Sequence, residues 1–390
     1  MNRRQFLTLT GTFTGGTLLL PDFLYAFGKQ QELSLGNQCV VFIQLNGGND
    51  GLNSFIPVDN PLYYELRPKI AIKMDDVIGR DNGMAFHPAL RNFAQMQQNG
   101  DLAVIQNVGY PEPVRSHFRS QEIWETAAAS NQYLTDGWLG RYLDLQCKEH
   151  NPVAGITIDY ISPLAFKGQE PNSMTLKNLE RLKKTALHQD NAEILSSNPQ
   201  LDFIRKVAQT VDGGTNEILK ALAKTPPKDV SYPKTDLGRN LEWIAKLIKG
   251  DLNSKVYYTS QSGFDTHQNQ LGIHKNKLSG LNDAVFAFYS DIKMAQLLKN
   301  VTVVIFSEFG RRVKDNGSGT DHGTAAPMFV IGGNNSGKII GNNPDLTDLD
   351  RGDLKHHIDF RSVYASLLHH QLDFNPRKIG ISNPALKGLF

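Results

Sequence analysis

Apolar runs without polar alternation recur along the chain, and most of them end in a loop that is rich in glycine and polar residues. They are CVVFIQL (39–45), LAVIQNV (102–108), KVYYTS (255–260), VTVVIFSEF (301–309) and APMFVIGG (326–333). Such runs are typical of strands that are buried on both faces, as in a parallel sheet. We therefore expect each run to form a strand of one central sheet.

Segments with helical character lie between these runs. They comprise PALRNFAQMQQNG (88–100), HFRSQEIWETAAA (117–129), a stripe of Leu281, Val285, Phe288 and Ile292, and DFRSVYASLLHH (359–370). Spacings of three and four place the apolar side chains of the stripe on one helix face. The alternation of strands and helices predicts an α/β fold, a three-layer sandwich with a mostly parallel central sheet.

Residues 165–250 interrupt this alternation. The segment is rich in charges, as in LKNLERLKKTAL, and contains no apolar run comparable to the predicted strands. We interpret it as a mainly helical insertion that covers one edge or the mouth of the sheet. Together with this insertion, residues 38–390 then form a single α/β domain.

The N-terminus carries a different pattern, MNRRQFLTLTGTFTGGTLLLP, in which Arg3 and Arg4 precede an uncharged and mildly apolar stretch. This pattern resembles a twin-arginine export signal over residues 1–28, cleaved near Ala26 or retained as an anchor. Because the Tat translocase carries folded proteins, the pattern predicts a periplasmic or secreted protein.

The composition indicates a globular protein and narrows the classes of partner. Of 390 residues, 40% are hydrophobic, and 41 basic and 39 acidic residues leave a net charge of +2. Without a block of like charges, the chain lacks the electrostatic signature of nucleic-acid binding. No uncharged apolar run of about 18 residues follows the N-terminal segment, so we expect no integral membrane domain beyond it. Cys39 and Cys147 are too few for a disulfide scaffold, although one disulfide between them is compatible with the sequence.

The loops that follow the predicted strands form the candidate site, because ligands of open α/β sheets bind at the carboxyl ends of the strands. Polar side chains in these loops are Asn46, Asp50, Arg115, Ser116, His117, Asp265, His267, Glu308, Arg311, Asp321 and His322. Single features have simpler explanations: Asn-Gly-Gly-Asn-Asp-Gly suits a turn, and Ser116 suits a helix N-cap. Carboxylates and imidazoles from several loops at one edge together favour a divalent metal site, because both groups are metal ligands.

The order of these motifs resembles the alkaline phosphatase superfamily, which includes sulfatases, phosphodiesterases and cofactor-independent phosphoglycerate mutases. The segments GGNDGLN, GFDTH, SEFGR and TDHGTAAPMFVIG are together similar to a Tat-exported bacterial branch known as domain of unknown function 1501. The resemblance spans residues 38–372. It implies an exported, metal-dependent hydrolase of phosphate, sulfate or related anionic esters.

The resemblance also implies a role for each loop residue. Ser116 is the nucleophile at a helix start, with Arg115 beside the oxyanion of a small anionic ester substrate. The metal ligands are Asp50, Asp265, His267, Glu308 and His322, supported by Asn46, His117, Arg311 and Asp321. The cofactor is one or two divalent ions among zinc, manganese, calcium and magnesium. Asn46 competes with Asp50 for the position after the first strand.

Phe309 departs from the family pattern, because it stands where the superfamily has a metal-binding histidine. A phenyl ring cannot ligate a metal, and Arg311 adds a positive charge nearby. Three accounts follow: one metal in place of two, a second site completed by Asp321, or a protein that keeps the fold without catalysis. In the first account we expect Asp321 to support His322 from behind.

Two functions therefore compete. The first is the metal-dependent hydrolase with a serine nucleophile, and the alternative is a non-catalytic exported binding or assembly protein. A third class, the α/β hydrolases, is disfavoured for Ser116 because the chain has no Gly-x-Ser-x-Gly elbow.

Overall fold

A nine-stranded mixed sheet forms the centre of the protein in the computed structural model, which describes residues 38–147, 150–177, 179, 213–226 and 230–390. The strand order is β11-β5-β10-β9-β1-β8-β6-β7, and β14 also pairs with β5. The strands are β1 Cys39–Asn46, β5 Leu102–Gly109, β6 Gly155–Ile158, β7 Ser173–Leu176, β8 Val256–Ser262, β9 Val301–Phe306, β10 Ala326–Gly332, β11 Ile339–Ile340 and β14 Ile358–Asp359. All five predicted strands are therefore present.

Strand direction decides where the loops meet. β1 lies between β8 and β9 and is parallel to both, with Val41 opposite Tyr257 on one side and Val303 on the other. β10 is antiparallel to its two neighbours, β9 and β5, which makes β5 parallel to β9. β10 consequently starts at the edge where β1, β5, β8 and β9 end, and the loop between β9 and β10 begins and finishes at that edge.

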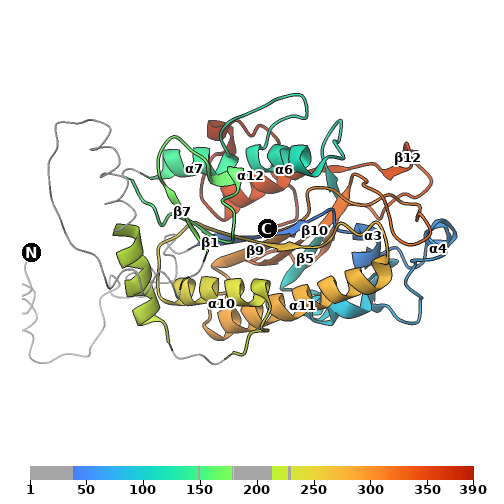
Figure 1. The fold of residues 1–390 in the computed structure, drawn as a ribbon, viewed down its shortest axis with the longest axis horizontal. Helices are drawn as coiled ribbons and strands as arrows, with labels where there is room; N and C mark the ends of the chain where they lie inside the picture. Colours follow the sequence, from blue (N-terminus) through green and yellow to red (C-terminus); the bar gives the residue numbers. More distant parts are fainter. Residues whose placement is uncertain (1–37, 148–149, 178, 180–212, 227–229) are drawn as a thin grey trace, which may run out of the picture. The chain divides into compact units, whose positions relative to one another are not determined.

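Helices cover both faces of the sheet (Figure 1). α6 His117–Thr126, α7 Trp138–Gln146 and α12 Phe360–His370 lie on one face, and α10 Asp236–Lys249 and α11 Gln270–Met294 lie on the other. α5 Arg91–Gln98 belongs to the second layer, because Phe93 packs in the same apolar cluster as α10 and α11. This arrangement confirms the predicted three-layer α/β sandwich with a mostly parallel sheet.

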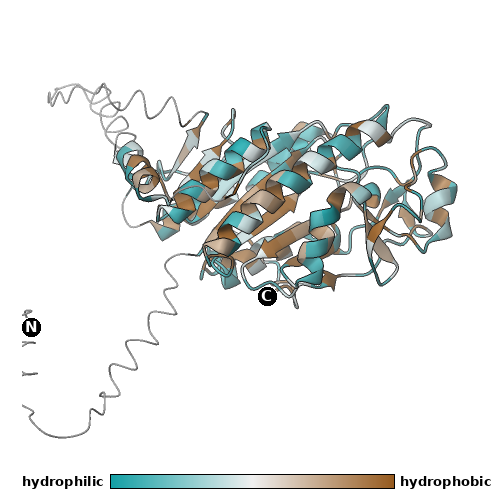
Figure 2. Cartoon of the chain, turned by 90° about the horizontal axis from the view of Figure 1, so that it is seen from below, coloured by the Kyte–Doolittle hydropathy of each residue, from teal (hydrophilic) through white to brown (hydrophobic). Residues whose placement is uncertain are grey.

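The two faces of each strand feed two separate cores. In β1, Val41 and Ile43 pack with α10 and α11, whereas Val40 and Phe42 pack with α6, α7 and α12. Strands buried on both sides need apolar residues at successive positions, which explains the unbroken apolar runs. Figure 2 shows the same distribution, with apolar strands at the centre and helices that are polar on their outer surface. The predicted stripe from Leu281 to Ile292 lies buried on α11.

Smaller elements complete the fold. A three-stranded sheet contains β2 Phe55–Ile56, β3 Ile78–Asp81 and β4 Met84–Phe86, and a two-stranded ladder contains β12 Leu349–Asp350 and β13 Asp353–Leu354. The short helices are α3 Gly51–Ser54, α4 Pro61–Leu66, η2 Pro88–Leu90, η3 Leu164–Phe166 and η4 Pro376–Ile379. The helix that we expected to begin at Pro88 thus starts as a 3₁₀ turn and continues as α5.

The predicted insertion is not purely helical. It contains β7, which extends the sheet by pairing in parallel with β6. Its sequence, SMTL, is short and only partly buried at the sheet edge, so it lacks the apolar run by which the central strands were found. α10 is helical as expected, and residues 180–212 lie outside the described residues, as does the whole predicted signal segment 1–28.

Both cysteines, Cys39 and Cys147, are free thiols, so the disulfide that the sequence allowed is absent. Burial raises the pKa of the Cys39 thiol to about 12, which keeps it protonated and unreactive. None of the helices in the described part of the chain combines the length and apolarity needed to cross a bilayer.

Candidate metal centre

Two loops and one helix start meet at the carboxyl edge of the sheet. Asp265 and His267 follow β8, and His117 is the first residue of α6. The loop between β9 and β10 folds back on itself, because Arg311 and His322 form an antiparallel bridge. Hydrogen bonds from Gly310 N to Thr324 O (2.7 Å) and from Gly323 N to Gly310 O (2.9 Å) close this small ladder. The ladder brings His322 back to the end of β9.

Three imidazole rings point their Nε2 atoms at one oxygen of the Asp265 carboxylate. The distances from Asp265 Oδ1 are 3.0 Å to His267, 3.1 Å to His322 and 3.5 Å to His117. The Nε2 atoms of His267 and His322 are also 3.0 Å apart. Two imidazole nitrogens this close either share a proton or bind a common ion. We call His117, Asp265, His267 and His322 the His-Asp cluster.

Each imidazole of the cluster is held from behind by an oxygen atom at Nδ1. His117 Nδ1 lies 2.8 Å from Glu308 Oε1, and His267 Nδ1 lies 3.2 Å from Asp321 Oδ1. His322 Nδ1 lies 2.8 Å from the backbone oxygen of Arg115. An acceptor at Nδ1 fixes the ring orientation and leaves the Nε2 lone pair for a ligand, as in most histidine–metal sites.

The donors of the cluster lie around one point, and three of its four residues bring their ligand atoms within 4.8 Å of one another. Ligand atoms about 2.0–2.1 Å from a tetrahedral zinc lie roughly 3.3 Å from each other, which the distances of 3.0–3.5 Å around Asp265 Oδ1 match. His117, Asp265 and His322 offer ligand atoms within 4.8 Å of one another, and the buried Nε2 of His117 has no hydrogen-bond partner. Three imidazoles with one carboxylate suit zinc or manganese better than calcium or magnesium, which prefer oxygen.

Glu308, which we expected to be a ligand, instead orients other groups. Its buried carboxylate accepts hydrogen bonds from Gly47 N (2.9 Å) and Ser307 Oγ (3.0 Å), besides its contact with His117. The hydrogen bond to Glu308 is the main reason why the pKa of His117 is raised above its usual value, against the opposing effect of burial. Asp321 likewise contacts His267 and not His322, so its expected place behind His322 is taken by Arg115 O.

Arg311 is a buried cation that joins the loops. Its guanidinium donates to the backbone oxygens of Gly48 (2.7 Å), Thr320 (2.9 Å) and Phe264 (3.0 Å), and also to Gly47 O. It lies 2.6 Å from Asp265 Oδ1 as well. Burial acts to raise the pKa of Asp265, but hydrogen bonds from Arg311 and His322 outweigh it and lower that pKa to about 2. Asp265 is therefore ionised at neutral pH and available to a metal.

Phe309 forms an apolar wall of the cluster. Its ring centroid lies 4.9 Å from that of His117 and 5.0 Å from that of His322. On its other side, a Cβ on Gly48 would come within 2.4 Å of Phe309, and Gly48 has a φ of +72°, so only glycine suits this position. Phe309 thus contributes an apolar ring, and no ligand atom, to the space beside His117 and His322.

Asp50 lies apart from the cluster. Its carboxylate is fully buried, forms an ion pair with Arg67 (2.6 Å) and accepts a hydrogen bond from Gln270. Although burial acts to raise it, the Arg67 guanidinium holds the pKa of Asp50 below its usual value. Arg67 also donates to the backbone oxygens of Val313 and Arg312, so this pair ties the region of α4 to the long loop after β9.

Ser116, Arg115 and Asn46 complete the predicted set. Ser116 occupies the N-cap of α6 and is exposed, but its side chain makes no capping hydrogen bond. The Arg115 side chain pairs with the buried carboxylate of Asp353. Asn46 lies at the end of β1, and its buried Oδ1 has no hydrogen-bond partner in the described structure. The loops thus bring together Asp265, His267 and His322, which we expected as ligands, with His117, which we expected only in support.

Two residues of the site escaped sequence analysis. Arg67 and Asp353 hold Asp50 and Arg115, yet neither lies in a motif or next to a predicted strand end. No signal in the sequence singled them out. The position of His117 could be inferred from the sequence, because in Arg-Ser-His at a helix start the imidazole directly follows the candidate nucleophile Ser116.

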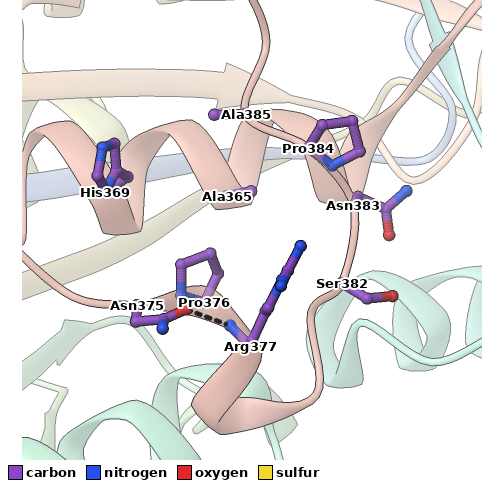
Figure 3. A pocket seen from close by; sticks show the side chains of 9 residues that line it. All are labelled: Ala365, His369, Asn375, Pro376, Arg377, Ser382, Asn383, Pro384 and Ala385. Atoms are coloured by element: carbon purple, nitrogen blue, oxygen red, sulfur yellow. Dashed lines mark hydrogen bonds between the residues drawn. The ribbon is translucent and has the colours of Figure 1, made fainter.

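A depression of about 350 Å³ near the C-terminus is separate from this site (Figure 3). Residues at the end of α12 and in the segment after it line the depression, among them His369, Asn375, Arg377 and Asn383. α12 starts at the carboxyl end of β5 and runs back, and Gln371 then bonds to Gly333 O beyond the end of β10. The depression therefore lies at the opposite edge of the sheet from the His-Asp cluster.

Residues 37–379 match the model of a protein family described as "Protein of unknown function (DUF1501)". The chain belongs to this family. The match covers nearly all described residues of the three-layer fold and confirms the resemblance seen in the sequence. A search of curated proteins found no match.

Solved structures with a similar course of the chain share few identical residues with it. A phosphonate monoester hydrolase from Silicibacter pomeroyi is 7% identical, with a TM-score of 0.45 over 90% of this chain and 76% of that chain. A protein in the alkaline phosphatase superfamily from Vibrio parahaemolyticus is 11% identical, with a TM-score of 0.41 over 89% and 70%. A sulfatase from Pseudoalteromonas sp. is 9% identical, with a TM-score of 0.40 over 95% and 76%.

Loss of Arg67 is expected to destabilise the fold. Arg67→Met leaves the buried Asp50 carboxylate without its cation, which costs about 3–5 kcal/mol of unfolding free energy. Urea unfolding measures the change. The control is Arg80→Met, which removes an exposed ion pair with Asp59 and is expected to cost less than about 1 kcal/mol. Asp50→Asn should also lose stability but keep zinc affinity; lost zinc binding at unchanged stability would make Asp50 a ligand after all.

Metal affinity is expected to rise with pH through the pKa of His117. A proton and a metal compete for His117 Nε2, and the hydrogen bond to Glu308 holds this pKa above its usual value of 6.5. Zinc affinity should thus fall by up to about tenfold per pH unit below that pKa, as measured by calorimetry between pH 5.5 and 8.5. Glu308→Gln should shift the profile to lower pH, whereas Asp321→Asn, at the exposed partner of His267, should shift it less. A flat profile would remove His117 from the metal.

Proposed function

We propose that the protein is a metal-dependent hydrolase of phosphate, sulfate or related anionic esters. The observation that carries this proposal is the common orientation of His117, His267 and His322, each held at Nδ1 by an oxygen and each directing Nε2 to Asp265 Oδ1. A purely structural role would not require all three histidines to engage Nδ1 and to present Nε2 to the same point. Zinc or manganese is the proposed ion, and one ion is proposed because Phe309 and Arg311 occupy the remaining space.

The residues of the site divide the chemical work. A bound ion would act as a Lewis acid toward one oxygen of the anionic ester and stabilise charge in the transition state. Arg311 keeps Asp265 ionised and holds the loops that carry the ligands. Glu308 and Asp321 orient His117 and His267, so the geometry exists before the substrate arrives. The rigid backing of each imidazole is what makes the site suited to catalysis.

Ser116 is the proposed nucleophile. It precedes His117 directly, is exposed, and is not engaged in capping α6. The unpaired amide groups and dipole of the α6 N-terminus favour a phosphate or sulfate at this place. In the proposed reaction, Ser116 Oγ bonds to phosphorus or sulfur while the bond to the ester oxygen breaks, and the alcohol leaves with the proton of the serine hydroxyl. Water then bonds to phosphorus or sulfur, the bond to Ser116 Oγ breaks, and the free anion and the serine hydroxyl are restored.

The second candidate is an exported binding or assembly protein without catalysis. One observation favours it: the Arg311 guanidinium already neutralises Asp265 at 2.6 Å, which weakens the attraction of the cluster for a cation. Elemental analysis of protein purified without chelator separates the two functions. About one zinc or manganese per chain supports the hydrolase, and absence of metal that zinc addition cannot restore supports the alternative.

Removal of His322 or Ser116 is expected to separate metal binding from chemistry. His322→Ala should lose metal and all hydrolysis, because His322 sits at the centre of the cluster. Ser116→Ala should keep the metal content and lose about 10²-fold or more in kcat, because the nucleophile is gone. Hydrolysis of aryl phosphate, phosphodiester and sulfate esters by metal-supplemented protein provides the measurement.

The control for these variants is Ser130→Ala, which removes an exposed hydroxyl that bonds to Pro111 O. It should leave both metal content and turnover unchanged. Full activity in Ser116→Ala would exclude the serine route, and hydrolysis of none of the esters by metal-loaded protein would favour the binding protein.

Export by the Tat translocase is part of the proposal and rests on the paired arginines near the N-terminus. Replacement of Arg3 and Arg4 by lysine should retain the protein in the cytoplasm, because this route reads the arginine pair and not its charge. Fractionation of cells followed by immunodetection gives the result. Unchanged export of the double variant would refute the signal.

A further inference from the structure

An apolar cavity of about 260 Å³ lies beside the His-Asp cluster. Its lining includes Tyr110, Phe309, Thr324, Ala325, Leu354 and His356. Its floor consists of buried apolar groups, since Tyr110, Phe309, Ala325 and Leu354 are all at most 6% exposed. For comparison, an apolar cavity of about 150 Å³ is large enough to bind benzene. The cavity can therefore accept an aromatic ring or a short alkyl chain.

Phe309 is a wall shared by the cavity and the cluster. Its ring packs against His117 and His322, and the same residue lines the cavity. Thr324 and Ala325 follow His322 by two and three positions and line the cavity too. The cavity and the metal ligands therefore lie on two sides of one side chain, and a molecule that reaches both has to pass around the Phe309 ring.

Arg115 ties the second wall of the cavity to the cluster. Its backbone oxygen lies 2.8 Å from His322 Nδ1, and its guanidinium pairs with the buried Asp353, next to Leu354. Thr324 Oγ1 also donates to the backbone oxygen of Leu354. These contacts fix the position of the cavity wall relative to the imidazoles. A surface depression without a function would not require them.

The mouth of the cavity differs from its floor. Glu112, Asp350 and Lys355 are exposed there, and His356 is half-buried. An apolar floor with a charged mouth suits a ligand that has an apolar body and polar ends, because the body gains from burial while the ends stay in water.

We propose that this cavity binds the apolar group of an anionic ester whose anionic end is held at the His-Asp cluster. The proposal rests on the proposed function for the position of the anion. It names the substrate class as esters that carry an aryl or alkyl group, as opposed to esters of sugars. Phe309, Leu354 and His356 are then specificity residues, and Arg115 is a positioning residue that aligns cavity and cluster.

The test uses binding of ligands that the enzyme cannot hydrolyse. Methylphosphonate and butylphosphonate carry the same anion, but the second has three more methylene groups. Each buried methylene increases affinity by about fourfold, so butylphosphonate should bind zinc-loaded protein up to roughly 60-fold more tightly. Neutral 1-naphthol, which has no anion, should bind both the zinc-loaded and the metal-free protein. Calorimetry measures all three.

Two variants fill the cavity from different sides. Leu354→Trp fills the floor, and His356→Trp, at a half-buried position that tolerates change more readily, closes the mouth. Either should abolish the advantage of butylphosphonate and the binding of 1-naphthol, while methylphosphonate affinity stays unchanged. The matched control is Leu145→Trp on α7, where the leucine is 58% exposed and does not line the cavity.

The outcomes separate this inference from the proposed function. Equal affinity for the two phosphonates together with no binding of 1-naphthol would overturn the cavity as a ligand site. Binding of 1-naphthol without binding of either phosphonate would uphold the cavity but refute its link to an anion site and, with it, the proposed hydrolase. A butylphosphonate advantage that survives in both tryptophan variants would place the apolar group elsewhere.

Discussion

The buried guanidinium of Arg311 is the interaction on which the arrangement of the site depends. A charge enclosed in protein is tolerated only when all of its donors are paired. Each of the three guanidinium nitrogens of Arg311 donates to at least one acceptor: backbone oxygens of the loops after β1 and β8 and of its own loop, and the Asp265 carboxylate. Two of these carbonyl groups belong to Gly47 and Gly48, which both have positive φ and form the turn after β1. One cation therefore joins three loops, which are also linked to each other by hydrogen bonds from Phe264 N to Asn46 O and from Gly47 N to Glu308 Oε1.

Most of the fold could be predicted because its central strands are buried on both faces and so leave an unmistakable apolar run. The direction of β10 could not be predicted, since a buried strand has the same composition whether it runs parallel or antiparallel to its neighbours. β7 escaped because an edge strand needs few apolar residues. The apolar stripe on α11 could be predicted for the opposite reason. Only one face of this helix packs against the core, so its apolar residues recur at a helical spacing.

The candidate site was predictable as a place but not as a set of roles. The loop after β8 and the loop between β9 and β10 had to bring Asp265, His267 and His322 to one edge once the antiparallel direction of β10 was known. Whether a carboxylate faces a metal depends on the side chains that pair with it, and those side chains lie outside the motifs that contain the carboxylates. Glu308 contacts His117 across 191 residues, and Arg67 lies 17 residues from Asp50 in a segment without any motif. Phe309 shows how a departure from a family pattern acquires meaning only in the structure, where its ring separates two imidazoles from an apolar cavity.

The reversal of the chain between β9 and β10 has a consequence for how the protein would acquire its ion. His117 and His322 meet only after β10 has inserted between β5 and β9, so the complete donor set exists only once the last central strand has been synthesised. Affinity alone favours copper over zinc and manganese for such ligands. If the chain is folded before export, the metal pool of the cytoplasm, and not the order of affinities, decides which ion it takes with it.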